Sequence, residues 1–457
     1  MNGMNMVKIA DLYKKASEYD LQEVTVAGWI DGIRLMKDIC FVSINDGSCF
    51  KSLQVTCTDS CSNYGEVKRL KEDSSVVITG TIRLDSSKSN AVEMEMGDFF
   101  IEGIARNEHP FKKKGQTLET LRTAQHLRVR TRVFNAIFRI RSILTVAVYD
   151  FFCEKGFVNI STPIITPSSF EGAGDMFQLV TQDSKGAIRK DFFGKEAFLA
   201  ISGQLYNEVF VYTYGNVYSF GPTFRAENSN TTQHLSEFWM IEPEMAFAEL
   251  EEGIDLAEDF IKFIVKRVLD NAMDELIFLN KRVDDGLVER LKKTYDTKFI
   301  RITHDEALSI LRDSQKTFEH DIHSCEELFK EHYEYLLDEY FQAPFFITNY
   351  PKKDAPFYMK VDADTNTVRN LFCFLPKVGE ILGGSEKEDD YDVLKNRIQS
   401  LNMNLEEYTY YLDIRKNGSV RHTGLGIGFE RCVMFLTGVS NIRDTIPFPR
   451  AANKCDF

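Results

Sequence analysis

The chain has 457 residues, of which 43% are hydrophobic, 12% aromatic and 27% charged. This balance is typical of a globular protein with enough apolar residues for a core, and it excludes disordered and collagen-like chains. No run of about 18 apolar residues and no signal-peptide block occurs, so we expect no membrane span. The nine cysteines form no CxxC pair. This argues against a disulfide scaffold or a zinc framework and favours reduced thiols in a cytoplasmic protein.

The net charge of −14 conceals one basic stretch. Residues 104–141 hold 10 Lys/Arg and 2 Asp/Glu, whereas the segments on either side of them are acidic. A basic stretch of this kind is either a solvated linker or the electrostatic footprint of a polyanion. The acidic average therefore does not exclude a nucleic-acid partner.

Short β-rich segments follow one another from residue 24 to residue 104. They lie at 24–29, 40–44, 52–56 and 75–82, with turn signals at 45–47 and 85–90. Five or so short strands at this spacing predict a small closed barrel, and a five-stranded OB-fold fits best, although a small sandwich gives a similar pattern. Since OB-folds commonly bind single-stranded nucleic acid, we interpret residues 1–104 as a nucleic-acid-binding domain.

Residues 105–125, which include three consecutive lysines, predict a basic hinge before a second domain at 126–457. A long amphipathic helix is expected from Thr131, because apolar residues recur at helical spacing until Gly156 ends it. An acidic and helical insertion at about 250–340 separates two strand-rich blocks. Strands and helices without regular βαβ alternation predict an α+β domain on an antiparallel sheet.

Two segments carry residues suited to chemistry. An apolar strand ends in Arg225-Ala-Glu227, and a return strand with Phe238 follows a polar loop. A guanidinium fixed on a strand suits a bidentate grip on phosphate, and an aromatic ring suits stacking on a base. Near the C-terminus, a glycine-rich strand leads into a helix that carries Arg431. Taken singly, these features also fit a surface salt bridge and a strand bulge.

Together these segments resemble the three signature motifs of class II aminoacyl-tRNA synthetases, at residues 131–166, 220–244 and 422–449. They are most similar to the asparaginyl-tRNA synthetases of the Asp/Asn/Lys subgroup, in which an OB-fold anticodon-binding domain precedes the catalytic domain. The resemblance covers essentially the whole chain. It rests on the tracts Glu171-Gly-Ala-Gly174, Asp191-Phe-Phe-Gly-Lys-Glu196, Ser202-Gly-Gln204, Phe224 to Thr231, Glu237 to Glu244 and Asn441 to Arg450.

The resemblance implies a ligase reaction in two steps. Asparagine and ATP would form asparaginyl-adenylate and pyrophosphate, and the acyl group would then move to the terminal ribose of tRNA-Asn. In such chemistry the protein mainly positions the reactants and neutralises charge, so arginines and Mg²⁺ matter more than a general base. The resemblance also implies a homodimer, because motif 1 helices of this class pair across a two-fold axis.

The resemblance implies a set of site residues as well. The ATP site would contain Arg225, Glu227, His234, Phe238, Glu380 and Arg431; of these, Arg225, Glu227 and Arg431 would be catalytic, and Glu380 would carry Mg²⁺. The amino acid would lie against Glu171, Ser202, Gln204, Asn207, Glu242, Ser385 and Lys387. An anticodon base would lie against Phe41 and Gln54, with Arg34 on a phosphate. The sequence alone fits Phe41 equally well as a residue of the barrel core.

One charge in the pocket favours asparagine over aspartate. The aspartate enzymes of the subgroup place a Lys three residues after the Gln of this strand, whereas this chain has Asn207. Without that cation, a bound carboxylate is under-compensated at a cost on the order of a few kcal/mol.

Several positions depart from the family pattern. Phe372 stands where the family has an Asp that helps to hold Mg²⁺, Lys387 replaces an Arg that recognises the substrate side chain, and Gln233 replaces an Arg. Arg421 replaces a Pro. Two interpretations follow: a working asparaginyl-tRNA synthetase with a rebuilt pocket, or a paralogue. The paralogue would be a ligand-binding pseudo-synthetase or an enzyme that adenylates another amino acid.

Reversing the charges of Lys112, Lys113 and Lys114 is expected to weaken tRNA binding and its salt dependence, because fewer phosphate counterions are released. Fluorescence anisotropy with labelled tRNA at two salt concentrations measures this effect, and ATP binding, which should not change, is the internal control. Unchanged tRNA affinity would identify the stretch as a solvated linker.

Overall fold

The computed structural model describes residues 6–59, 61, 64–85, 91–106, 111, 116–167, 175–190, 192–229, 231–323 and 327–456. The chain divides into two compact units, Met1–Ala124 and Gln125–Phe457. Lys112, Lys113 and Lys114 of the predicted hinge lie outside the described residues.

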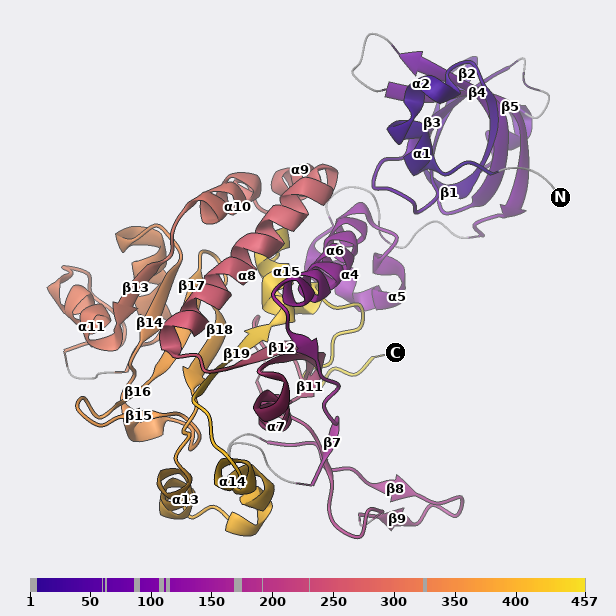
Figure 1. The fold of residues 1–457 in the computed structure, drawn as a ribbon. Helices are drawn as coiled ribbons and strands as arrows, with labels where there is room; N and C mark the ends of the chain where they lie inside the picture. Colours follow the sequence, from indigo (N-terminus) through magenta and orange to yellow (C-terminus); the bar gives the residue numbers. More distant parts are fainter. Residues whose placement is uncertain are drawn as a thin grey trace. The chain divides into compact units, whose positions relative to one another are not determined.

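The first unit is a closed five-stranded barrel (Figure 1). Its strands are β1 (Glu23–Leu35), β2 (Ile39–Asn45), β3 (Leu53–Thr58), β4 (Ser75–Asp85) and β5 (Ala91–Gly103), in the order β1-β2-β3-β5-β4. The described part of this unit also contains the short α-helices α1 (Ile9–Lys14), α2 (Ala16–Tyr19), α3 (Tyr64–Val67) and α4 (Leu118–Leu121). Alternate residues point inward, so that Val42, Ile44 and Val55 are fully buried. The predicted OB barrel is confirmed, and a sandwich is excluded.

The second unit is built on an eight-stranded sheet. In sheet order its strands are β13 (Ile300–Thr303), β14 (Phe345–Thr348), β17 (Asn370–Leu375), β18 (Gly379–Glu386), β19 (His422–Gly428), β12 (Glu237–Ala246), β11 (Asn216–Phe224) and β6 (Val158–Asn159). The central pairs are antiparallel, whereas β13–β14 and β11–β6, the two outer pairs, are parallel. The predicted hairpin is β11–β12, in which Phe224 pairs with Glu237.

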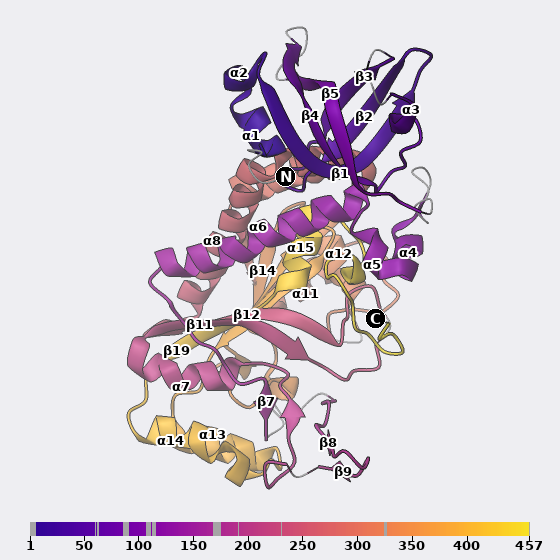
Figure 2. The same ribbon diagram turned by 90° about the vertical axis from the view of Figure 1, so that its right-hand side faces the viewer.

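Helices pack against both faces of this sheet (Figures 1 and 2). On one face lie α6 (Arg132–Glu154), α8 (Leu250–Asn271) and α15 (Phe429–Thr437), and on the other lies α7 (Gln204–Tyr214) with α14 (Thr409–Lys416) and α13 (Tyr391–Ser400) behind it. The helix predicted from Thr131 is confirmed as α6, whose apolar stripe is buried and which is followed by Gly156 at a φ of +78°. None of the described helices is long and apolar enough to cross a membrane.

The remaining elements of this unit are short. They are the helices α5 (Gln125–Arg128), α9 (Met273–Arg282), α10 (Leu287–Asp296), α11 (His304–Asp313) and α12 (Lys330–Tyr335), and the strands β7 (Ile165–Thr166), β8 (Thr181–Gln182), β9 (Ile188–Arg189), β10 (Phe198–Leu199), β15 (Val361–Asp362) and β16 (Thr367–Val368). The stretch 250–340 is therefore not helical throughout, since it contributes β13 to the main sheet. Four residues give too little periodicity to reveal a strand whose partner, β14, begins 45 residues later.

Part of the basic stretch at 104–141 is used inside the fold. Arg128 is fully buried, its Nη1 lies 3.4 Å from the carboxylate of Asp444, and its Nη2 donates to the carbonyl oxygens of Arg443, Ile446 and Pro447. Arg141 forms an ion pair of 2.8 Å with Glu430, which is also buried. These two arginines hold the C-terminal segment in place, so they do not contribute to an external footprint.

Replacing Arg128 with Ala is expected to lower the free energy of unfolding of the second unit by about 3–5 kcal/mol, because it leaves a buried carboxylate without its counter-charge. Urea denaturation followed by circular dichroism measures the change. The matched control is Lys155→Ala, which breaks an exposed ion pair with Asp259 and should cost at most about 1 kcal/mol. Equal losses in the two variants would contradict the structural role of Arg128.

Candidate active site

A pocket with about 680 Å³ of empty space opens on one face of the sheet, where β12, β18, β19 and the start of α15 meet. All six residues predicted for the ATP site line it: Arg225, Glu227, His234, Phe238, Glu380 and Arg431. Gln233, Met240, Gly426 and Gly428 are also part of its wall. The structure therefore brings together residues that are separated by more than 200 positions in the sequence.

Arg225 follows directly on β11, and its guanidinium carbon lies 5.3 Å from the centre of the Phe238 ring. Within the described residues its side chain has no carboxylate partner, and its buried Nε has no hydrogen-bond acceptor. An arginine held in this way keeps its charge available for a ligand. Because the Phe238 ring lies in the same wall, a flat base and an anion can be bound side by side.

Arg431 occupies the opposite part of the pocket. Its Nη1 donates to the backbone oxygen of Glu380 at 2.7 Å and lies 3.4 Å from the Glu380 carboxylate. That carboxylate is 46% exposed, so it remains accessible to a cation. The pocket therefore presents two arginines and a partly exposed carboxylate, which suits a phosphate chain and its counter-ion.

The loop before β12 contributes His234 and Gln233. His234 Nδ1 lies 2.5 Å from the hydroxyl of Thr231, and burial, together with the charge of Arg431, lowers the pKa of this imidazole. A neutral ring suits contact with a ligand next to two arginines. Gln233, which occupies a position with Arg in the family pattern, donates to the backbone oxygen of Val378 instead.

A second cluster lies further along β12, where every second side chain from Phe238 to Glu244 points to the same face of the sheet. The carboxylate of Glu242 accepts hydrogen bonds from the hydroxyl of Ser202 at 2.5 Å and from the backbone N–H of Gly203. The Asn207 amide donates to the hydroxyl of Ser219 and to the backbone oxygen of Glu242. The cluster is a polar floor whose members are each fixed by a neighbour.

Behind this floor, Gln204 connects to a buried ionic network around Glu208. The Glu208 carboxylate accepts hydrogen bonds from Gln204, Tyr411 and Arg415, and lies 2.9 Å from Nε2 of His422. Burial alone would raise the pKa of Glu208, but Arg415 and His422 hold it well below its ordinary value. The network joins α7, α14 and β19, so it fixes the back of the pocket.

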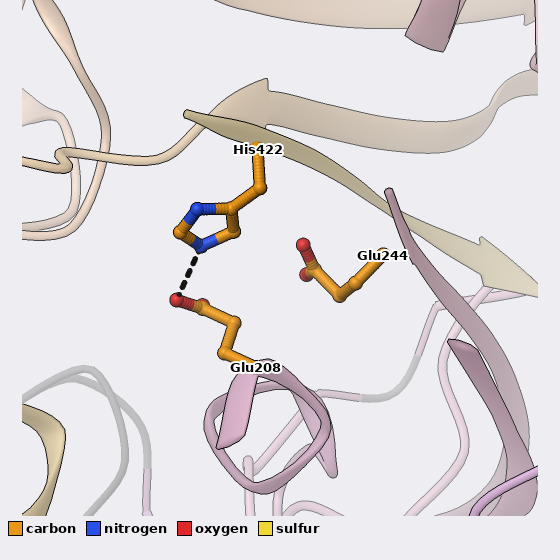
Figure 3. Close-up of side chains that lie close together, drawn as sticks. All are labelled: Glu208, Glu244 and His422. Atoms are coloured by element: carbon orange, nitrogen blue, oxygen red, sulfur yellow. Dashed lines mark hydrogen bonds and ion pairs between the residues drawn. The ribbon is translucent and has the colours of Figure 1, made fainter. Parts of the chain in front are cut away.

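Glu244 is the functional candidate that the motif comparison missed (Figure 3). It is fully buried, and within the described residues neither carboxylate oxygen has a hydrogen-bond donor. Its closest counter-charge is Lys387, whose Nζ lies 3.6 Å away and 3.3 Å from the hydroxyl of Ser385. A Cβ on Gly424 would lie 1.9 Å from Oε1 of Glu244, so only glycine allows the carboxyl to stand there.

Glu208, Glu244 and His422 offer ligand atoms within 4.8 Å of one another (Figure 3). This spacing alone would suit a metal ion. However, Arg415 and Lys387 already bring two positive charges to the same place. A third cation would be repelled there, so we assign no metal to this group.

Glu171, Arg421 and Phe372 are the remaining positions that the sequence singles out. Glu171 lies outside the described residues, and Arg421 contacts the backbone oxygen of Phe247 near the surface. Phe372 lies opposite Gly383 on the sheet, and its ring centre is 5.1 Å from that of Tyr350. An apolar ring therefore stands at the position where the family pattern has a carboxylate.

In the first unit, the three anticodon candidates lie on the outer surface of β1–β3. Arg34 is exposed and stacks over the Phe41 ring at 4.9 Å, and Gln54 donates to Glu93 at 3.0 Å. Phe41 is half-buried and alternates with the inward-facing Val42, so it is not a residue of the barrel core.

Comparisons with known proteins agree with both units. The family model described as "tRNA synthetases class II (D, K and N)" matches residues 117–452, and the model of an "OB-fold nucleic acid binding domain" matches residues 24–101. Sheet, pocket and barrel are thus those of a class II aminoacyl-tRNA synthetase with an N-terminal OB-fold.

Curated relatives narrow the assignment. The asparagine--tRNA ligase of Clostridium acetobutylicum is 45% identical over 99% of this chain and 100% of its own length, and that of Alkaliphilus oremlandii is 42% identical over the same shares. The asparaginyl-tRNA synthetase from Pyrococcus horikoshii, solved with asparaginyl-adenylate, has a TM-score of 0.85 and 30% identity, with full coverage of both chains. The chain belongs to the asparagine--tRNA ligase family.

Proposed function

We propose that this chain joins asparagine to its tRNA through an asparaginyl-adenylate, and that the two clusters along β12 bind the two halves of that intermediate. The proposal rests on one observation, which is that both clusters lie along the same strand, β12. Phe238 lies at the phosphate-binding end of β12, while Glu242 and Glu244 lie on the same face further along it. A ligand that places a nucleotide at one end and an amino acid at the other matches this arrangement.

ATP would occupy the pocket between the two arginines. Phe238 and Arg431 hold the adenine between them, Arg225 holds the α-phosphate together with the substrate carboxylate, and Glu227 and His234 line the remaining wall. Because the arginines are positioned before the reaction, they stabilise the charge that develops at the α-phosphate. This role explains why no general base is needed in the pocket.

Glu380 would hold Mg²⁺, which neutralises phosphate charge when it is bound. The exposed carboxylate fits this ion, because Mg²⁺ takes one or two carboxylates and fills its other positions with phosphate and water oxygens. Phe372 offers no oxygen on the neighbouring strand. The protein therefore contributes fewer ligands to the ion than the family pattern does.

The amino acid would lie on the polar floor. Ser202, Gln204 and Glu171 would hold the α-ammonium group, with Glu242 nearby, and Asn207 would keep the environment neutral. Ser385 and Lys387 would face the side chain, and we add Glu244 to them. Lys387 replaces the planar fork of arginine with a point charge. The side chain of the substrate thus meets one cation and one carboxyl group.

Arg34, Phe41 and Gln54 would hold the anticodon, with stacking on Phe41 contributing about 1–3 kcal/mol per base. The basic hinge at 105–125 would contact the tRNA backbone. The eight described cysteines are free thiols, which supports a site of action in the cytoplasm.

Asparagine-dependent exchange of labelled pyrophosphate into ATP tests the activity directly. With Mg²⁺ at about pH 8, we expect kcat/KM for L-asparagine to exceed that for L-aspartate at least about tenfold, a difference of about 1.4 kcal/mol. Arg225→Lys should lower the exchange roughly 100-fold or more, because the two-donor fork is lost. The control Arg301→Lys lies on β13, away from the pocket, and should retain activity.

Other outcomes would select the alternatives. Exchange that responds to a different amino acid would point to an adenylating paralogue. ATP binding without exchange for any amino acid would point to a pseudo-synthetase. If the protein binds ATP without exchange because positions 387 and 372 have lost the family residues, Lys387→Arg combined with Phe372→Asp should restore exchange.

We also propose that the protein works as a homodimer, with the second copy seated on α6 and β6. Val146 and Tyr149 of α6 are 56% and 44% exposed, and Val158 of the sheet-edge strand β6 is 39% exposed. The Tyr149 ring lies 5.6 Å from that of Phe220, and Phe220 lines a groove together with Trp239. An apolar helix face next to a free strand edge suits self-complementary contact across a two-fold axis.

Analytical ultracentrifugation is expected to give about twice the chain mass of 52.6 kDa at micromolar concentration. Val146→Asp together with Tyr149→Asp should convert the protein to a monomer, because two charges would be buried at the interface. Ile277→Asp on α9, which is 58% exposed, is the matched control. A wild-type monomer would contradict the proposal.

A further inference from the structure

Glu244 is a buried carboxyl group without a hydrogen-bond donor among the described residues, and Lys387 is its nearest counter-charge there. The two side chains are 0% and 2% exposed. Their separation of 3.6 Å is longer than a hydrogen bond, and both Glu244 oxygens are without donors among the described residues. A buried carboxyl without hydrogen-bond donors is costly. Glu244 lies two residues along β12 from Glu242 of the polar floor, on the same face, so an amino acid on that floor could supply the missing donor.

Several charged and titratable groups surround Glu244. They are Lys387 after β18, Arg415 and the Tyr411 hydroxyl on α14, Glu208 on α7, Glu242 on β12 itself and His422 on β19. Burial, opposed by Lys387 and assisted by Glu208 and Glu242, raises the pKa of Glu244 to about 8. Glu244 can therefore be neutral or ionised near physiological pH, unlike Glu208, which Arg415 and His422 keep ionised.

The two protonation states of Glu244 recognise different ligands. The ionised carboxylate can only accept a hydrogen bond, so it pairs with the N–H₂ of a carboxamide while Lys387 donates to the carboxamide oxygen. The protonated carboxyl carries an O–H that can donate to a carboxylate oxygen, and Lys387 then neutralises that carboxylate. Ionised Glu244 and a substrate carboxylate would repel each other in a water-poor pocket.

We propose that the protonation state of Glu244, paired with Lys387, sets the discrimination between asparagine and aspartate, so that protonation of Glu244 opens the site to aspartate. This inference rests on the proposed function and deepens it. The proton comes from solvent before the amino acid binds, and it returns there when asparagine is bound instead. Lys387 is important because a point charge at 3.6 Å, without a hydrogen bond, stabilises the ionised carboxyl less than the two donors of an arginine fork would.

The ionised and the protonated form of Glu244 accept different substrates, so pH changes the two activities in opposite directions. The kcat/KM for asparagine is proportional to the fraction of free enzyme with ionised Glu244, and that for aspartate to the protonated fraction. Their ratio should therefore rise tenfold per pH unit over the whole range from about pH 6 to pH 9. Aspartate itself stays ionised there, since its side-chain pKa is about 3.9. Titration of His234 affects both substrates alike and cancels in the ratio.

Pyrophosphate exchange with each amino acid, measured in half-unit steps of pH, tests the inference. Glu244→Gln should make the ratio independent of pH, because an amide does not titrate. Lys387→Arg should keep the tenfold slope but raise the ratio at every pH. The matched control is Glu275→Gln on α9, a buried carboxyl with a raised pKa outside the pocket, which should keep the wild-type slope.

Each remaining result counts against the inference. A wild-type ratio that does not change with pH overturns it, as does the absence of aspartate-dependent exchange at pH 6 while asparagine-dependent exchange persists. Both results leave the proposed function intact. Absence of exchange with asparagine at every pH would instead remove the proposed function and this inference with it. The wild-type profile decides the question even if Glu244→Gln fails to fold.

Discussion

The carboxylate of Glu208 is bound by three donors, Gln204, Tyr411 and Arg415, with the His422 ring beside it. These contacts join elements up to 214 positions apart in the sequence, and they lie in the interior, where a lost partner is costly. Because the hydrogen-bond partners of this network are all residues of the fold itself, the network holds α7 and β19 in place on either side of the polar floor. The position of Gln204 on α7 therefore depends on this network.

Glu244 lies next to this network and receives none of its donors. The contrast has a physical cause: Arg415 and His422 both reach Glu208, while Gly424 leaves just enough space for the second carboxyl. Lys387 offsets its charge without a hydrogen bond. One carboxyl thus stabilises the scaffold and the other remains available to a ligand, so that the same fold supplies both rigidity and selectivity.

Much of the architecture could be predicted, since α6 follows from its helical periodicity and the barrel from short alternating strands. Arg225, Phe238 and Arg431 were recognised because their motifs are local in sequence. Glu244 was missed although Glu242-Pro-Glu244 places two carboxyls on one strand face, because burial and partners are set by distant residues such as Gly424. Arg128 belongs to the basic stretch that the sequence predicts to be exposed, but Asp444, 316 positions away, pairs with it inside the fold.

The central claim is that Glu244 changes its protonation state with the substrate side chain. Calorimetric titration at pH 8, in buffers of different ionisation enthalpy, measures the protons exchanged when non-hydrolysable asparaginyl- and aspartyl-adenylate analogues bind. Since the pKa of Glu244 is about 8, we expect roughly half a proton to be released with the asparaginyl analogue and roughly half a proton to be taken up with the aspartyl analogue. Equal proton exchange with the two analogues would contradict the account.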